Sequence, residues 1–222
     1  MVKRGAIALG IVLVAATACS GGDDGGGEKQ PPPQDTLRRA STAMRDLRSV
    51  AFTLSTEGDP GVPVRSGDVR LLRNGDAEGT LNLQQSGQAV EMKIVALGET
   101  FYVKGVTGGW QRYPKQLAAA MYDPSAVLDP NRGISRLLSS VAQPEAEKTE
   151  KVNGKDAYKV RGTLPKDVVA GLIPGLKGDV KGHVWVGTAD HRLLKVKGDV
   201  NGGSVTVTFT EFDKPYKISA PA

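Results

Sequence analysis

Apolar and polar residues alternate with a period of two along most of this chain, which is the pattern of strands with one buried face. Turn residues such as Asn74-Gly75 and Ser86-Gly87 close the short runs of the first half. These gaps have hairpin length and favour an antiparallel meander. We expect strands over Val50–Ser55, Val69–Arg73, Leu81–Gln84, Val90–Ile94, Phe101–Lys104, Glu147–Val152, Ala157–Gly162, His183–Gly187, Leu193–Val200 and Ser204–Phe212.

A helical period replaces this alternation in three segments. Asp35 is expected to cap the first helix. Asp-Pro pairs at 123–124 and 129–130 are typical of a cap followed by a proline in the first turn, and Pro165–Ile173 is expected to form one more short helix. The apolar stripes of the first two segments are Leu37, Ala40, Met44 and Leu47, and Ile134, Leu137, Leu138 and Val141. About ten strands and three or four helices, in the order strands, helices, strands, predict an α+β domain with one large curved antiparallel sheet and helices on one face.

The N-terminus has the features of an export signal. Lys3 and Arg4 precede an uncharged run, Gly5–Ala18, that is shorter than the roughly 20 residues a spanning helix needs. The small residues Ala16, Thr17 and Ala18 come directly before Cys19. This stretch resembles the lipobox of bacterial lipoproteins, although Leu is usual where Ala16 stands. The resemblance implies cleavage after residue 18 and attachment of diacylglycerol to Cys19. The alternative is an ordinary signal peptide that leaves a free thiol.

Residues 19–34 are expected to tether the folded domain to a membrane. They are rich in Gly and Pro and contain no large apolar side chain, so they cannot bury enough surface to offset the entropy of ordering. Cys19 is the only cysteine, which excludes an internal disulfide. The lipobox resemblance implies that it is an anchor rather than a redox or metal group. We therefore divide the chain into a signal over 1–18, a lipidated tether over 19–34 and one domain over 35–222.

Composition gives little indication of catalysis or of nucleic-acid binding. Without Lys3 and Arg4 the chain has 27 Lys and Arg against 24 Asp and Glu, and these charges are dispersed. His183 and His191 are expected to be ordinary residues of strands or strand ends, since no acidic or Cys partner has metal-ligand spacing. We expect no metal, no cofactor, no nucleic-acid partner and no enzymatic activity.

The broad sheet raises the question of what fills its concave face. Aromatic residues make up only 5% of the chain, so few large side chains are available. The residues alone leave open whether the helices fill this face or leave an apolar cavity of the size that ligands occupy. The expected lining is Met44, Val50, Phe52, Leu54, Leu81, Leu83, Val90, Met92, Ile94, Phe101, Val103, Leu137 and Leu138.

The order of these features is similar to that of a known family. The lipobox, the tether, the strand and helix series, and the stretches "VNGKDAYKVRGTL" (152–164) and "SVTVTFTEFDKPYKISAP" (204–221) resemble the LppX/LprAFG lipoproteins of actinobacteria. The resemblance implies a half-barrel sheet wrapped over helices, as in outer-membrane lipoprotein carriers, with an apolar cavity between them.

The resemblance also implies a function and a location. It implies a monomer, lipid-anchored to the outer face of the cell membrane, that binds multi-acylated lipid or glycolipid and carries it to the outer envelope. A membrane transporter is a candidate partner. The alternative function is a structural or stress-sensing lipoprotein that has a filled core and acts through protein contacts.

Overall fold

The computed structural model describes residues 30–85, 87–119, 123–172, 178–200 and 202–222. Its helical elements are α1 (Pro33–Arg45), α2 (Lys115–Ala119), the 3₁₀ turn η1 (Pro124–Ala126), α3 (Ile134–Ser139) and α4 (Lys166–Val169). Its strands are β1 (Ser49–Gly58), β2 (Val64–Leu72), β3 (Ala77–Gln85), β4 (Gln88–Leu97), β5 (Thr100–Lys104), β6 (Gln111–Pro114), β7 (Ala142–Ala146), β8 (Glu150–Val152), β9 (Lys155–Leu164), β10 (Val180–Gly187), β11 (Leu193–Val200) and β12 (Gly203–Phe212).

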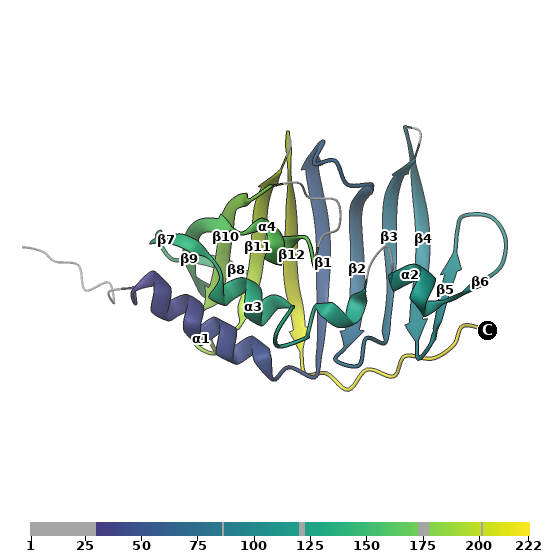
Figure 1. Ribbon diagram of the computed structural model, residues 1–222, viewed down its shortest axis with the longest axis horizontal. Coiled ribbons are helices and arrows are strands. Elements are labelled where there is room, and N and C mark those ends of the chain that lie inside the picture. The colour runs from purple at the N-terminus through teal and green to yellow at the C-terminus, as the bar shows by residue number, and fades with distance from the viewer. Residues whose placement is uncertain (1–29, 86, 120–122, 173–177, 201) are drawn as a thin grey trace, which may run out of the picture.

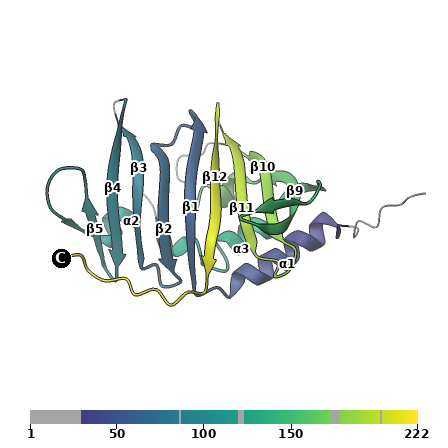
Figure 2. The same ribbon diagram turned by 180° about the vertical axis from the view of Figure 1, so that it is seen from behind.

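The described strands form one antiparallel sheet. Its order is β6-β5-β4-β3-β2-β1-β12-β11-β10-β9-β7, with β8 paired to β9 (Figures 1 and 2). The first and last strands of the chain therefore lie side by side and join two meanders, one from each half of the sequence. The helices gather on one face of the sheet (Figure 1). The expected α+β architecture with a large antiparallel sheet is confirmed.

Helices α1 and α3 pack together over the end of the sheet formed by the second meander. The Ser41 hydroxyl donates to the Ser135 carbonyl at 2.8 Å, and the Ser135 hydroxyl donates back to the Ser41 carbonyl at 2.9 Å. This reciprocal pair satisfies buried polar groups that would otherwise be costly. Gly133 precedes α3 where only glycine fits, because a Cβ there would lie 2.2 Å from the Val127 carbonyl oxygen.

The first helix differs from the expectation at its start. It begins at Pro33, and Pro32 rather than Asp35 is its N-cap. Proline suits this first position because its missing N–H has no intrahelical partner there. Asp35 lies in the first turn, 3.0 Å from Arg38. The expected stripe of Leu37, Ala40, Met44 and Leu47 is buried, as the period predicts.

The strand after α3 is also placed differently. The expected strand over 147–152 is shortened to β8 at 150–152, and an unexpected strand, β7, comes before residues 147–149. Pro144 lies within β7 at the edge of the sheet, where a missing N–H is tolerated. The turn Asn153-Gly154 has the positive φ angles of a type I′ hairpin.

An ionic cluster holds β7, β8 and the residues between them against the outer face of β9 and β10. The Lys159 ammonium lies 3.0 Å from Glu147 and 3.2 Å from Glu150, and the Trp185 indole N–H donates to Glu150 at 2.9 Å. The hydrogen bond from Lys159 holds the pKa of Glu147 below its ordinary value. The hydrogen bond from Trp185, followed by that from Lys159, does the same for the pKa of Glu150.

The lowered pKa values of Glu147 and Glu150 predict that the fold is less stable in acid than at neutral pH. A carboxylate with a depressed pKa stabilises the fold above its unfolded pKa of 4.5 and loses that contribution as the pH falls through the lower folded value. We expect the melting temperature to fall as the pH drops from neutral to about 3, and to fall less in Lys159→Met. The control Lys151→Met removes an exposed pair with Asp156 and should keep the wild-type slope. Equal slopes in all three proteins would contradict the assignment.

Candidate functional site

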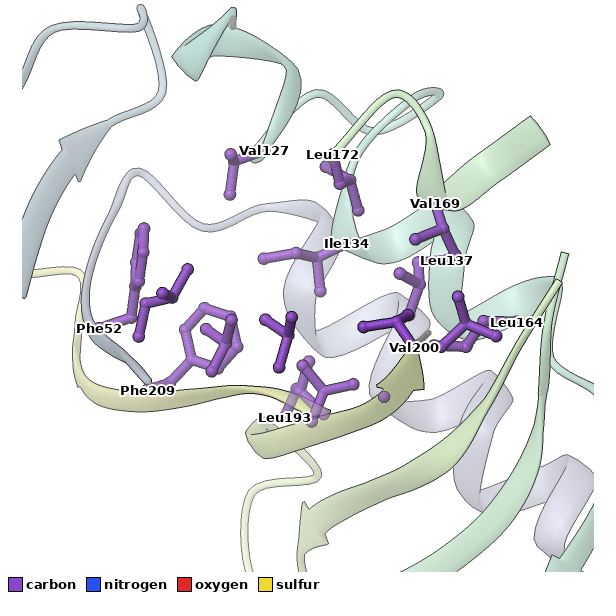
Figure 3. Close-up of a pocket in the computed structure, with 16 residues that line it drawn as sticks. Phe52, Val127, Ile134, Leu137, Leu164, Val169, Leu172, Leu193, Val200 and Phe209 are labelled. Atoms are coloured by element: carbon purple, nitrogen blue, oxygen red, sulfur yellow. The ribbon is translucent and has the colours of Figure 1, made fainter. Parts of the chain in front are cut away.

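An apolar cavity lies between the sheet and its helices, in the region where the two meanders meet. Strands β1, β9, β10, β11 and β12 form its floor through alternate side chains that face the helices. Sixteen residues line it, and none has a polar side chain (Figure 3). They are Phe52, Leu54, Val127, Ile134, Leu137, Leu164, Val169, Leu172, Val180, Leu193, Val196, Gly198, Val200, Val205, Val207 and Phe209.

The roof of the cavity comes from short elements of the middle of the chain. Val127 precedes α3, Ile134 and Leu137 lie on α3, and Val169 and Leu172 belong to α4 and the residues after it. Figure 3 shows these side chains opposite Phe52, Leu193 and Phe209 of the floor. Val127, Ile134, Leu137 and Val169 of this roof are buried, and Leu172 is partly exposed.

The cavity is small in this conformation. Its volume is about 120 Å³. Ligand pockets usually measure about 300–1,000 Å³, and an engineered apolar cavity of about 150 Å³ holds benzene. The space therefore fits one small apolar group, and a longer guest requires the roof to move outward or the guest to continue onto another surface.

Such a surface continues from the cavity across β2, β3, β4 and β5. One row of cross-strand neighbours begins at Leu54 and runs through Gly67 and Leu81 to Met92. A second row begins at Phe52 and runs through Val69, Gly79 and Ile94 to Val103. Pairing in register keeps each row on one face of the sheet. We call Val69, Leu81, Leu83, Val90, Met92, Ile94 and Val103 the open apolar face, because each of them is partly exposed.

The expected lining residues divide into three groups in the structure. Phe52, Leu54 and Leu137 line the cavity. Leu81, Leu83, Val90, Met92, Ile94 and Val103 lie on the open apolar face beyond it, and Phe101 packs against the edge of the main core. Met44, Val50 and Leu138 do not line the cavity and are corrections to the expectation. They are at most 2% exposed, because α1 and α3 press them into the core.

Sequence reasoning missed most of the floor. Nine of the lining residues come from β9 to β12 or the ends of those strands: Leu164, Val180, Leu193, Val196, Gly198, Val200, Val205, Val207 and Phe209. Their alternation is as clear as that of the first half. What the alternation could not show is that β1 pairs with β12, which brings the second meander under the helices.

The remaining candidate residues lie away from the cavity. His183 is on the outer face of β10, 3.4 Å from Glu147, and His191 lies in the turn before β11 with a φ of 55°. Within residues 30–222, apart from the short gaps given above, no group of three potential metal ligands is found. In the same part of the chain no helix has the length and apolar character needed to span a bilayer. Cys19 lies outside the described residues.

Comparison with known proteins assigns the family. The family model described as LppX_LprAFG lipoprotein matches residues 32–218, which is nearly all of the described chain. The chain belongs to the LppX/LprAFG lipoprotein family. The resemblance expected from the sequence is thereby confirmed.

Relatives of this family member extend over most of its length. The lipoarabinomannan carrier protein LprG of Mycolicibacterium smegmatis is 31% identical over 193 residues, which cover 84% of this chain and 81% of that protein. LppX of Mycobacterium tuberculosis, named as a candidate phthiocerol dimycocerosate transporter, is 28% identical over 185 residues, covering 82% and 77%.

Solved structures support the fold of this LppX/LprAFG protein. LprF of Mycobacterium bovis superposes with a TM-score of 0.76 at 22% identity, covering 87% of this chain and 98% of that one. LppX of Mycobacterium tuberculosis superposes with a TM-score of 0.65 at 25% identity, covering 86% and 100%. The architecture described above is therefore that of the family.

Proposed function

We propose that this protein is a non-catalytic carrier that binds multi-acylated lipid or glycolipid and moves it between the cell membrane and the outer envelope. The observation that carries the proposal is the cavity wall, in which sixteen residues offer no polar side chain, continued by the open apolar face. Acyl chains match such a surface, whereas a reaction would need acid, base or nucleophilic groups there. The relatives named as carriers of glycolipid and lipid support this proposal.

The energetics of transfer fit a carrier that uses no external energy. Burial from water stabilises each methylene by about 0.8 kcal/mol. A lipid that leaves a bilayer already has this stabilisation, so its transfer into an apolar site is close to neutral. The cavity is smaller than an acyl chain, and the proposal therefore includes outward movement of the α3–α4 roof, with further methylenes lying on the open apolar face.

The proposed site leaves the headgroup at the protein surface. The cavity offers no hydrogen-bond donor from a side chain, so a phosphate or sugar would be unpaired inside it. We therefore place the headgroup outside the wall, in water. The same reasoning makes the acyl chains, and not the headgroup, the main determinant of affinity.

A vesicle assay tests the carrier proposal. Donor vesicles contain pyrene-labelled phosphatidylglycerol, and acceptor vesicles contain none. We expect the protein to accelerate the loss of pyrene excimer emission in proportion to its concentration, because each molecule carries lipid between the vesicles. Absence of both acceleration and lipid uptake would overturn the proposal and favour a protein-contact role.

We further propose that Cys19 holds the protein, as a monomer, to the outer face of the cell membrane. Two acyl chains on one residue give firm anchoring, whereas a single chain binds only marginally. Cys19→Ala should abolish incorporation of labelled palmitate and release the folded protein from the membrane fraction. Ser20→Ala is the matched control and should keep both. Palmitate incorporation into Cys19→Ala would refute this anchor.

A further inference from the structure

The large apolar side chains that are most exposed lie at one end of the molecule. Among the described residues, the exposed large hydrophobic side chains are Val106 at 72%, Leu117 at 65% and Tyr113 at 43%. All three fall within the segment that runs from the β5–β6 loop through β6 into α2, which are neighbouring elements at one end of the sheet (Figure 1). Single exposed apolar residues are ordinary, but their concentration in one segment marks an interaction site.

The β5–β6 loop stands clear of the rest of the domain. A Cβ built on Gly105, Gly108 or Gly109 would meet no atom within 4 Å. Figure 1 shows the loop extending outward beyond β4 at the end of the sheet opposite α1. Val106 therefore lies on a projection that can reach a surface before the body of the domain does.

The charge of this segment has one sign. Between Thr100 and Ala119 the chain has Lys104, Arg112 and Lys115 and no acidic residue. Lys104 and Arg112 are exposed, and Trp110 is partly exposed beside them. Basic residues mixed with Trp, Tyr and Leu are typical of protein segments that lie at the interface of an anionic bilayer.

We infer that Lys104–Leu117 is a docking edge that binds the surface of an anionic phospholipid bilayer. Val106 and Leu117 enter the boundary between headgroups and acyl chains, while Lys104 and Arg112 contact lipid phosphates. A second copy of the chain is a poorer occupant, because two such edges would bring like charges together.

The docking edge would serve the carrier function proposed above, and its biological role depends on that function. Val103 of β5 and Ile94 of β4 belong to the open apolar face and lie beside the docking edge. A bilayer held there would adjoin this face, so an acyl chain could pass from the membrane toward Phe52 and Leu54 with little exposure to water.

An environment-sensitive label tests the docking edge. Val106→Cys introduces one thiol besides Cys19, which is acylated in the anchored protein, so nitrobenzoxadiazole labels position 106 alone. The labelled full-length protein, processed and anchored, is placed in vesicles of phosphatidylcholine with or without phosphatidylglycerol. We expect a blue shift and an intensity rise of about twofold only with phosphatidylglycerol, since charge brings the apolar side chain to the interface. Gln88→Cys, at the exposed start of β4, is the matched control and should not respond.

Further variants separate the docking edge from the carrier function. Adding Lys104→Gln and Arg112→Gln to the labelled protein should abolish most of the shift, as should high salt. The same substitutions should leave uptake of pyrene lipid from detergent micelles unchanged, because they do not touch the cavity. If the emission of the label at position 106 does not change with phosphatidylglycerol while the protein still transfers lipid, the docking edge is wrong and the carrier function stands. A shift without vesicles that grows with protein concentration would overturn it in favour of self-association.

Discussion

Val207→Trp is expected to lower lipid uptake by about tenfold or more while the protein remains folded. Val207 is a partly exposed residue of β12 that faces the cavity. An indole there would occupy most of the 120 Å³ that is free. A lost factor of ten corresponds to about 1.4 kcal/mol of binding free energy, which is less than the burial of two methylenes. The measurement is the titration of the variant with pyrene-labelled phosphatidylglycerol.

Val207→Trp is expected to change the free energy of unfolding only slightly, because the indole fills space that is empty in the wild-type protein. At about 24 cal/mol per Å³, an empty space of 120 Å³ costs roughly 3 kcal/mol, which filling partly recovers. Overpacking strain costs about 1–3 kcal/mol in the opposite direction. The control is Thr206→Trp, at the partly exposed neighbour of Val207 on the opposite face of β12, which should retain most uptake. Wild-type uptake by a folded Val207→Trp would show that the ligand site is elsewhere.

Leu138→Ala is expected to have the largest effect on stability, with a loss of about 2–5 kcal/mol in the free energy of unfolding. Leu138 is 1% exposed and packs in the main core with Met44 and Leu37 of α1. The lost methyl groups leave a space that α1 and α3 cannot close. Lipid uptake by the molecules that remain folded should be unchanged, because Leu138 does not line the cavity.

Leu137 gives a matched comparison with Leu138, one residue away. It lies on the same helix but lines the cavity. Leu137→Ala should cost about 2 kcal/mol, the low end of the range, because part of its surroundings is already empty. It should also raise uptake of bulky lipids, since the enlarged space admits them. Denaturant unfolding and lipid titration on both variants separate the two roles. Loss of uptake in a fully folded Leu138→Ala would contradict this division of core and cavity.

The parts of the fold set by local pattern could be predicted from the sequence. Alternation located β1, β3, β4 and β5, because the side-chain period of a strand is fixed by its backbone. The turn at Asn153-Gly154 could be predicted for a similar reason, since these residues favour positive φ. The bounds of short strands could not be predicted in this way. Residues 142–152 form two strands and not one over 147–152, because the ladder with β9 is interrupted at 147–149, and no local property of those residues shows this.

The candidate site could be predicted only in part, because it depends on contacts between distant segments. Phe52 and Leu54 line the cavity since β12 pairs beside them, but their alternation alone is identical to that of Leu81 and Leu83 on the open apolar face. Met44 and Leu138 have the apolar character of lining residues. They are core residues instead, because the reciprocal hydrogen bonds of Ser41 and Ser135 draw α1 and α3 together over them.

Mass spectrometry tests the central claim most directly. The Cys19→Ala variant, which is expected to be released from the membrane of its native host, is purified without detergent and measured under native and under denaturing conditions. Any covalent modification contributes to both masses, so their difference reports only what is bound without a covalent bond. The carrier account predicts a difference equal to the mass of a multi-acylated lipid or glycolipid. Identical masses, together with no uptake of pyrene lipid afterwards, would contradict it.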